Sequence, residues 1–121
     1  MSNPINEVGQ TYSRPWGTYK TIEMGTLFQA KIITVIPGGR LSLQKHFKRS
    51  EHWVVVEGVA AITVGDSTKD YVVGEHVYIP LEAIHRLENK TGSGVSIIEV
   101  QVGTYLGEDD IVRLDDIYNR D

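Results

Sequence analysis

The stretch "LQKHFKRSEHW" (residues 43–53) is crowded with side chains that can bind a metal ion. Gln44, His46, Glu51 and His52 lie within nine positions, and His85 follows later within "LEAIHRLEN". A single buried histidine is more often a hydrogen-bonded core residue than a ligand, and most glutamines lie on the surface. The combination is what points to metal chemistry. Since the chain has no cysteine, a metal site here must use nitrogen and oxygen ligands.

The segments that must position these residues have the pattern of short strands separated by turns. Runs such as "GTYKTIEM", "LFQAKIITVI", "HWVVVEG", "VAAITVG" and "VSIIEVQVG" are rich in residues that favour strands. About eight or more such strands at close spacing predict an all-β sandwich or small barrel. The runs on either side of Gly58 predict a hairpin. Only the tail, "EDDIVRLDDIYNRD", fits a helix as well as a strand.

Length and composition bound the remaining possibilities. The 121 residues suffice for one hydrophobic core, which we expect in residues 14–121 after a polar N-terminal arm, residues 1–13. The net charge of −4 argues against a nucleic-acid partner, because phosphate binding needs a basic face. The N-terminus has neither the basic nor the apolar region of a signal peptide, and no apolar run reaches the roughly 18 residues of a membrane span. We therefore expect a cytoplasmic protein that binds no membrane.

The spacing of the metal-capable residues resembles the two signature motifs of the cupin superfamily. The matching positions are Gly38, Gln44, His46, Glu51 and Gly58 in the first motif, and Gly74, Pro80, His85 and Asn89 in the second. Two positions depart from the usual pattern: Gln44 replaces the first histidine, and Glu82 replaces a glycine.

The resemblance implies a single-domain jelly-roll barrel of antiparallel strands with one divalent metal ion held by Gln44, His46, Glu51 and His85. Such a mixed ligand set suits Zn²⁺, which we favour, and also Mn²⁺, Co²⁺, Ni²⁺ or Fe²⁺. It leaves positions open for substrate or water. We exclude His52, which follows Glu51 directly and should face the opposite side of a strand.

A narrower resemblance covers roughly residues 14–120. The segments "RPWGTY", "PGGRLSLQKHFKRSEHWVVVEG", "YIPLEAIHRLEN" and "IEVQVGTYLGEDDIVRLDDIY" are similar to the isomerase domain of type II phosphomannose isomerases. That domain is usually the C-terminal part of a bifunctional mannose-1-phosphate guanylyltransferase, and phosphomannose isomerases also use the Gln-x-His pair. The resemblance implies a small phosphorylated sugar as partner and the interconversion of mannose 6-phosphate and fructose 6-phosphate through a cis-enediol. The sequence has no Gly-rich nucleotide loop, so nucleotide transfer is not predicted.

An enediol mechanism needs a base near the sugar carbons, an electrophile for the developing charge and a cationic site for the phosphate. Strand alternation places Lys31 on one face with Gln29, and Glu99 on one face with Gln101. If both faces line the cavity, Lys31 and Glu99 are the catalytic candidates; the alternative is an outer face with Lys31 in solvent. For substrate binding the candidates are Arg113, ranked first, with Arg49, Arg14 and Gln101, because a guanidinium grips phosphate through two parallel hydrogen bonds.

Three alternatives stay open at this point. Phosphomannose isomerases usually carry a run of histidines after Gln-x-His, whereas this chain has Phe47 and Lys48. A cupin that binds a sugar phosphate without turnover therefore remains possible, as does a sugar epimerase or a dioxygenase. Gln44 argues against the dioxygenase, which usually has histidine ligands. We also expect a homodimer, because jelly rolls expose edge strands and edges invite pairing; the N-terminal arm could cross to the partner.

Overall fold

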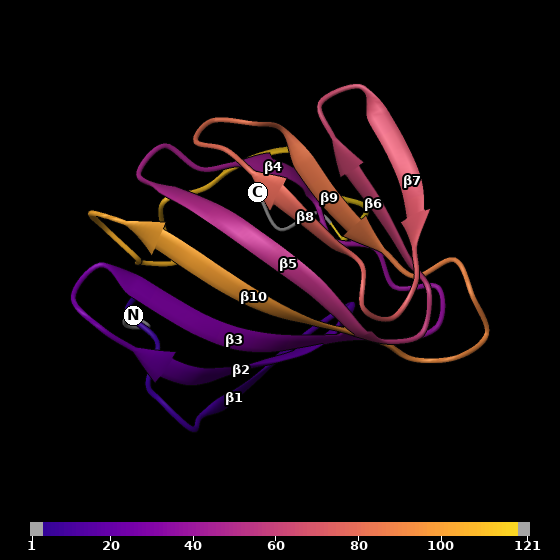
Figure 1. Ribbon diagram of the computed structural model, residues 1–121, viewed down its shortest axis with the longest axis horizontal. Coiled ribbons are helices and arrows are strands. Elements are labelled where there is room, and N and C mark those ends of the chain that lie inside the picture. The colour runs from indigo at the N-terminus through magenta and orange to yellow at the C-terminus, as the bar shows by residue number, and fades with distance from the viewer. Residues whose placement is uncertain (1–3, 119–121) are drawn as a thin grey trace.

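Two antiparallel β-sheets face each other in the computed structural model, which describes residues 4–118 (Figure 1). The first sheet contains, in spatial order, β1 (Thr11–Arg14), β2 (Gly17–Met24), β3 (Phe28–Val35), β10 (Val95–Gly103), β5 (Arg49–Glu57) and β8 (His76–Ile79). The second contains β11 (Val112–Asp115), β4 (Leu43–Lys45), β9 (His85–Glu88), β6 (Ala60–Val64) and β7 (Ser67–Tyr71). The prediction of an all-β jelly roll with at least eight strands is confirmed, with eleven strands in two sheets that do not close into one barrel.

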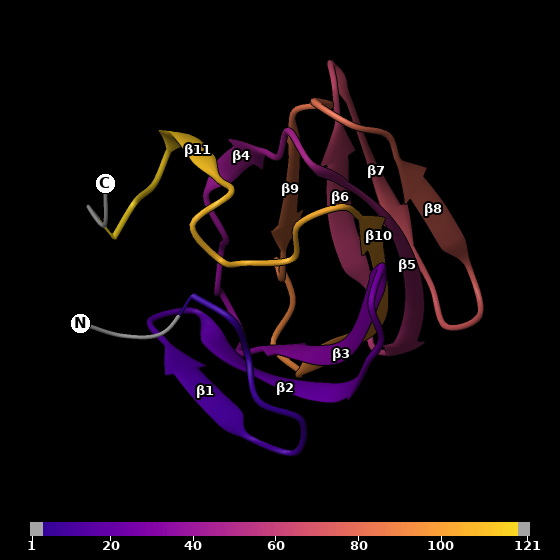
Figure 2. The ribbon, with the colours of Figure 1, turned by 90° about the vertical axis from the view of Figure 1, so that its left-hand side faces the viewer.

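The segment from β10 to β11 crosses from the first sheet to the second (Figure 2). Among the residues that the structure describes, no helix is long and apolar enough to span a membrane.

The inner face of the first sheet is divided along its strands into an apolar half and a polar half. In β3 and β10 the paired inward residues run from Val35 with Val95 and Ile33 with Ile97 to Lys31 with Glu99 and Gln29 with Gln101. β5 repeats this order, from Val55 and Trp53 to Glu51 and Arg49. Register therefore places all the polar inward side chains at the same end of the sheet.

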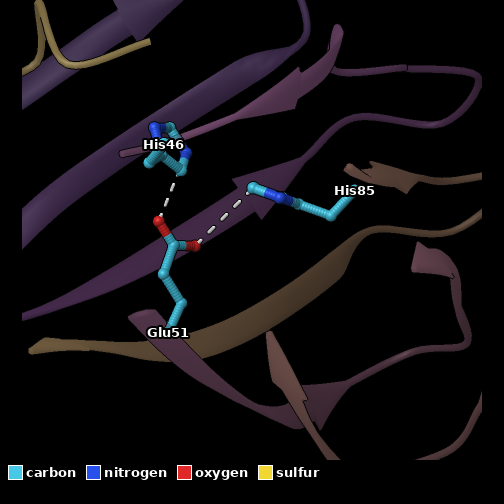
Figure 3. A group of neighbouring side chains, drawn as sticks. All are labelled: His46, Glu51 and His85. Atoms are coloured by element: carbon cyan, nitrogen blue, oxygen red, sulfur yellow. Dashed lines mark ion pairs between the residues drawn. The ribbon is translucent and has the colours of Figure 1, made fainter. Parts of the chain in front are cut away.

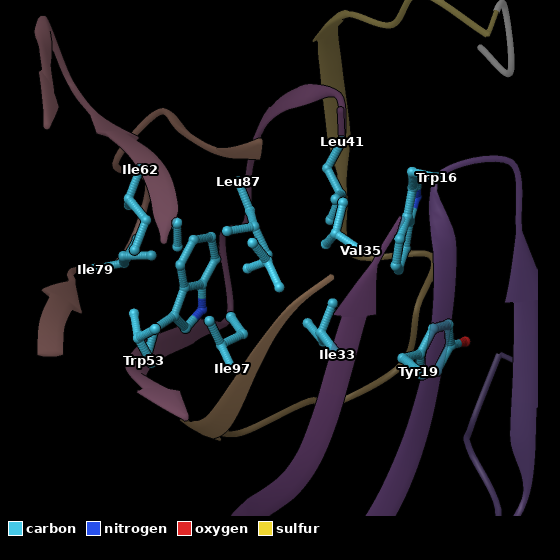
Figure 4. Close-up of a cluster of buried hydrophobic side chains, with 13 residues drawn as sticks. Trp16, Tyr19, Ile33, Val35, Leu41, Trp53, Ile62, Ile79, Leu87 and Ile97 are labelled. Atoms are coloured by element: carbon cyan, nitrogen blue, oxygen red, sulfur yellow. The ribbon is translucent and has the colours of Figure 1, made fainter. Parts of the chain in front are cut away.

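The apolar half forms the hydrophobic core. Thirteen buried side chains from both sheets meet there, among them Trp16, Val35, Trp53, Ile62, Leu87 and Ile97 (Figure 4). Fully burying an aliphatic side chain of this size stabilises a fold by about 1.5–3 kcal/mol. The core thus fixes the separation of the two sheets, and this separation positions the polar half of the inner face.

The hairpin predicted around Gly58 is wrong. β5 pairs with β10 and β8, whereas β6 pairs with β7 and β9, so the chain changes sheets at Gly58 instead of folding back. The helical alternative for the tail is wrong as well, since residues 112–115 form β11 against β4. The expected boundary between residues 13 and 14 falls inside β1, and the ends of both expected segments, residues 1–3 and 119–121, lie outside the described residues.

The glycines of the two motifs occupy backbone conformations that other residues rarely adopt. Gly38, Gly58 and Gly74 all have positive φ angles, of 78°, 74° and 92°. Glu82, which stands where the second motif usually has glycine, has a φ of 64° and is the one described non-glycine residue with a positive φ. The turn geometry of the motif is therefore kept here without its glycine.

Gly58 and Gly65 allow a matched stability test, because both have a positive φ and differ in crowding. An ideal Cβ at Gly58 would lie 2.4 Å from the carbonyl oxygen of Gly94, whereas one at Gly65 meets nothing within 4 Å in the described structure. We expect Gly65→Ala to lower the free energy of unfolding by roughly 1–2 kcal/mol, the usual cost of a left-handed residue. Gly58→Ala should cost about 3 kcal/mol or more, since the turn must also move.

Chemical denaturation of the two variants and the parent protein measures the difference. Equal losses for the two variants would contradict the close approach of Gly58 to Gly94.

Candidate functional site

Nitrogen and oxygen atoms that can bind a metal ion lie close together on three buried side chains, each from a different part of the fold. Glu51 projects inward from β5, His46 directly follows β4, and His85 begins β9 (Figure 3). The Nε2 atom of His46 lies 3.3 Å from Oε2 of Glu51, and the Nε2 atom of His85 lies 3.9 Å from Oε1. One ligand atom from each residue fits within a span of 4.8 Å, so this group can hold a metal ion.

Both histidines are oriented by backbone carbonyl groups. His46 Nδ1 lies 2.6 Å from the carbonyl oxygen of Asp110, and His85 Nδ1 lies 2.9 Å from that of Ala83. Carbonyl oxygens only accept, so each Nδ1 carries the hydrogen and each Nε2 is left as an acceptor. That of His46 accepts from Arg49 Nη2 at 3.3 Å. Burial lowers the pKa of His46 to about 4, although Glu51 opposes this, so His46 is neutral at pH 7. A neutral imidazole with a carbonyl behind it is the usual form of a metal-ligating histidine.

Glu51 is ionised despite being 2 % exposed. Burial alone would raise the pKa of its carboxyl group, but Arg49 and the two histidines outweigh burial and hold that pKa well below its usual range. Arg49 Nε donates to Oε2 at 2.8 Å, and Trp53 Nε1 donates to Oε1 at 2.9 Å. An ionised carboxylate facing two imidazoles is a chemically suitable donor set for a divalent ion.

Gln44, the fourth predicted ligand, lines the same cavity and stands opposite His85 in the β4–β9 pair. Its amide nitrogen donates to both the carbonyl and the hydroxyl oxygen of Ser42 at 3.3 Å. The amide oxygen is therefore the atom that Gln44 would offer to a metal ion.

Ionisable side chains continue from the ligand group along the cavity wall. Burial and the neighbouring Glu51 raise the pKa of Glu99 to about 8, so Glu99 holds a proton at neutral pH and is hydrogen-bonded to Glu51. Gln101 Nε2 donates to Glu99 Oε1 at 2.9 Å. Lys31, the neighbour of Glu99 across the β3–β10 pair, extends over the ring of Tyr19. Both catalytic candidates thus line the cavity that contains the ligand group.

Of the four residues predicted to bind substrate, two line the cavity and two do not. Arg113 lines the cavity from β11, and its Nε is buried without a hydrogen-bond partner among the described atoms. Arg49 also lines it but is bonded to Glu51. Gln101 is buried behind Glu99, and Arg14 is exposed beside the rings of Tyr12 and Tyr19; neither lines the cavity.

Sequence reasoning missed Glu108, which reaches the cavity from the segment between β10 and β11. Its Oε2 accepts from Lys31 Nζ at 3.1 Å and from Asn6 Nδ2 at 3.2 Å, and lies 3.8 Å from Arg49 Nη1. Burial would raise the pKa of Glu108, but Lys31 and Arg49 outweigh it and lower that pKa. The only signal in the sequence was its position in "GEDDIVR", beside Arg113.

Asp110 in the same segment supports the ligand group from behind. Besides the carbonyl that accepts from His46, its carboxylate accepts from the backbone N–H groups of Phe47 and Lys48, at 3.1 and 2.9 Å. The side chains of Phe47, Lys48 and His52 are exposed and line no part of the cavity. The exclusion of His52 from the ligands agrees with this outward position.

Comparison with known proteins decides the family. The family model described as "Mannose-6-phosphate isomerase C-terminal" matches residues 3–116. The chain belongs to this mannose-6-phosphate isomerase C-terminal family. The resemblance inferred from the two motifs is thereby confirmed.

Relatives of this chain are much longer proteins. The alginate biosynthesis protein AlgA of Pseudomonas aeruginosa is 53 % identical over 107 residues, which are 88 % of this chain and 22 % of AlgA. The mannose-1-phosphate guanylyltransferase ManC of Salmonella typhimurium is 50 % identical over 107 residues, with the same two shares. The chain therefore matches about a fifth of the length of these relatives.

Solved structures support the fold of the family domain. A cupin-2 domain protein from Rhodospirillum rubrum matches with a TM-score of 0.67 at 16 % identity, over 77 % of this chain and 67 % of that one. The capsular polysaccharide assembling protein CapF of Staphylococcus aureus matches with a TM-score of 0.74 at 22 % identity, over 88 % of this chain and 32 % of that one. At such identities the likeness concerns the jelly-roll fold alone.

Asp110 and Asp109 provide a matched test of the support behind His46. Asp110→Ala removes both acceptors for the backbone of residues 47 and 48, so His46 should lose its fixed orientation. We expect Zn²⁺ affinity to fall by about 10- to 100-fold, as for other residues that orient metal ligands. Asp109 is exposed and accepts from Tyr105 at 2.6 Å, so Asp109→Ala should leave Zn²⁺ affinity unchanged.

Isothermal titration with Zn²⁺ measures both affinities, and circular dichroism establishes that both variants are folded. A folded Asp110→Ala protein with unchanged Zn²⁺ affinity would refute the positioning role of Asp110.

Proposed function

We propose that this domain is a metal-dependent aldose–ketose isomerase that interconverts mannose 6-phosphate and fructose 6-phosphate. One observation carries the proposal: in a chain of this family, a buried group of two imidazoles and a carboxylate shares its cavity with a second buried carboxyl group, that of Glu99. The first supplies a site for an electrophile, and the second supplies a proton carrier. The isomerisation needs both.

Gln44, His46, Glu51 and His85 would hold the divalent ion, for which we favour Zn²⁺ over Mn²⁺, Co²⁺, Ni²⁺ or Fe²⁺. When bound, such an ion polarises sugar oxygens and so stabilises an enediolate. The ligand set, with Gln44 contributing an amide oxygen, would leave positions open for the substrate.

Proton transfer is the part of the reaction assigned to Glu99. An aldose becomes a ketose when a proton leaves C2 and one returns to C1, while a second proton moves from O2 to O1. A group with a pKa near neutral pH can both accept and release a proton, which suits this exchange. Gln101 fixes the carboxyl group of Glu99 from behind, and Lys31 supplies positive charge on the next strand.

Phosphate binding is assigned to Arg113. Its guanidinium lines the cavity at the end that β11 covers, and its unpartnered Nε is one of the donors that a phosphate oxygen would satisfy. Arg49 is paired with Glu51 through Nε, but its Nη1 is also buried without a hydrogen-bond partner among the described atoms. It would therefore add positive charge and one further donor to the site. The exposed Arg14 could contribute only at the rim.

A cupin that binds a sugar phosphate without turnover is the second candidate, motivated by Phe47 and Lys48 in place of the usual histidines. The outward position of both side chains weakens this motive, because their replacement removes nothing from the cavity wall. A sugar epimerase would need the same metal site and proton carrier, so only product analysis separates it from the isomerase.

The first test is turnover by metal-loaded protein. Protein loaded with Zn²⁺, Mn²⁺ or Co²⁺ should convert mannose 6-phosphate to fructose 6-phosphate in a coupled assay, and chelator treatment should abolish the conversion until metal is restored. The double variant His46→Ala/His85→Ala should purify with little metal and no activity. Metal-loaded protein that binds mannose 6-phosphate but forms no fructose 6-phosphate would replace the isomerase proposal with the binding protein.

The second test separates the roles of Glu99 and Arg113. Glu99→Gln keeps the shape of the side chain but removes the transferable proton, so kcat should fall by about 100-fold or more with little change in KM. Arg113→Ala should mainly raise KM, by about tenfold or more, if it binds phosphate equally in ground and transition states. Glu23→Gln, the same substitution at an exposed position, is the control. A Glu99→Gln enzyme with normal kcat would remove Glu99 from the chemistry.

A further inference from the structure

One polar side chain near the N-terminus is buried although its neighbours are not. Asn6 is 6 % exposed, whereas the residues on either side of it are exposed. Before Asn6, the carbonyl of Pro4 accepts from the N–H of Glu108 at 2.8 Å; after it, the N–H of Gly9 donates to a carbonyl of β2 at 2.8 Å. The N-terminal segment, residues 4–10, thus packs against its own chain and joins β2 to the segment between β10 and β11.

The Asn6 side chain uses both its nitrogen and its oxygen in hydrogen bonds to buried polar groups. Its Nδ2 donates to Gln29 Oε1 at 2.9 Å and to Glu108 Oε2 at 3.2 Å. Its Oδ1 accepts from the hydroxyl of Tyr19 at 3.2 Å. A segment that needed only an anchor would be held as well by an apolar side chain, because apolar burial requires no matched partners. The three bonds therefore indicate that Asn6 orients the groups it contacts.

The direction of the Asn6 amide is fixed by two groups that can bond in one sense only. The carboxylate of Glu108 only accepts, so the nitrogen of Asn6 must face it. Arg14 Nη2 only donates, to the hydroxyl oxygen of Tyr19 at 3.2 Å. The hydroxyl hydrogen of Tyr19 is therefore left to point at Asn6 Oδ1. If the amide were reversed, its oxygen would face the carboxylate and both groups would lose a partner.

Two further amides carry this direction from Asn6 to Glu99. Gln29 Oε1 accepts from Asn6, and also from Thr21 Oγ1 at 3.3 Å. Gln29 Nε2 consequently faces away from both donors and donates to Gln101 Oε1 at 2.8 Å. Gln101 Nε2 in turn donates to Glu99 Oε1 at 2.9 Å. We call the three side chains Asn6, Gln29 and Gln101 the amide series.

No member of the amide series can reverse by itself. Turning over the amide of Gln101 alone would place its nitrogen against the nitrogen of Gln29 and its oxygen against Oε1 of Glu99. Both glutamine side chains are fully buried, so two donors and two acceptors would be left without partners where such a loss is most costly. Oε1 of Glu99 is thereby held as an acceptor, and when this carboxyl group carries a proton the hydrogen is on Oε2.

We propose that the three members of the amide series are positioning residues, which hold the carboxyl group of Glu99 so that a proton is exchanged at Oε2. The inference rests on the proposed isomerase. In its ionised form Oε2 would take the proton that leaves C2, and in its protonated form it would return that proton to C1, so the carboxyl group ends as it began. None of the three lines the cavity, and one of them makes the N-terminal segment part of the active site.

Side-chain amide signals of ¹⁵N-labelled, Zn²⁺-loaded protein test the amide series without any need for turnover. Asn6→Ala removes the first donor, so the NH₂ signals of Gln29 and Gln101 should shift and exchange with water about fivefold faster or more. Gln10→Ala is the matched control, because Gln10 is exposed in the same segment and donates to the carbonyl of Thr11. It should leave both signals unchanged, and circular dichroism establishes that each variant is folded.

Kinetics of the Zn²⁺-loaded variants test what the amide series does for the reaction. Asn6→Ala should lower kcat about tenfold and leave KM for mannose 6-phosphate within about twofold, because the group it disturbs carries a proton and does not grip the phosphate. Asn6→Asp turns an acceptor toward Gln29, which drives the glutamine amides to reverse, so kcat should fall further. Gln10→Glu makes the same change from amide to carboxylate at an exposed position and should keep the parent kcat.

Two results would overturn the proposal. The first is a folded Asn6→Ala protein whose Gln101 signal is unchanged, because the direction set at Asn6 would then not reach Glu99. The second is an active parent enzyme whose kcat both Asn6 variants leave unchanged, as expected if Asn6 only anchors the segment. A parent protein without turnover would instead refute the isomerase proposal, and the amide series would then be judged by the Gln101 signal alone.

Discussion

A buried carboxylate, Glu51, imposes the constraint on which the polar half of this fold depends. Removing an ionised carboxylate from water costs several kcal/mol unless charges and hydrogen bonds replace its hydration. Here the replacement comes from Arg49 and Trp53 on the same strand and from the protonated Glu99 on β10. Any shift of these strands relative to one another would leave the carboxylate unsatisfied, so the same contacts that tolerate the charge also fix the site's geometry.

Trp53 connects this constraint to the hydrophobic core. Its ring belongs to the core cluster, its Nε1 donates to Glu51, and its ring lies edge to face with that of His85, with centroids 5.6 Å apart. A side chain held by core packing therefore sets the position of one metal-capable oxygen and one imidazole. Each central strand therefore has an apolar end and a polar end on its inner face, because every one of these strands must contribute both to the core and to the site.

Sequence patterns predicted the parts of the site that follow from strand alternation and failed where the chain leaves the sheets. Alternation grouped Lys31 with Gln29 and Glu99 with Gln101 but left open whether these faces point inward, and motif spacing brought His46, Glu51 and His85 into one cavity. Alternation gives a face but no depth, which is why Gln101 was expected to meet substrate although it lies behind Glu99. The hairpin at Gly58 failed because two strand patterns around a glycine do not reveal which sheet each strand joins. Glu108 was missed because the segment between β10 and β11 has no periodicity from which a direction can be read.

The turn that carries Glu82 shows how the site's demands override local preference. A left-handed conformation costs a residue other than glycine roughly 1–2 kcal/mol, and glutamate has no side-chain feature that removes this cost. The turn nevertheless keeps a positive φ, and the N–H of Glu82 donates to the carbonyl of His46 at 2.8 Å. One residue further on, the carbonyl of Ala83 accepts from Nδ1 of His85. The turn thus links the backbone of one imidazole residue to the ring of the other. A turn with a relaxed backbone would lose both hydrogen bonds. The strain would be relieved, but the two histidines would no longer be held in place around Glu51.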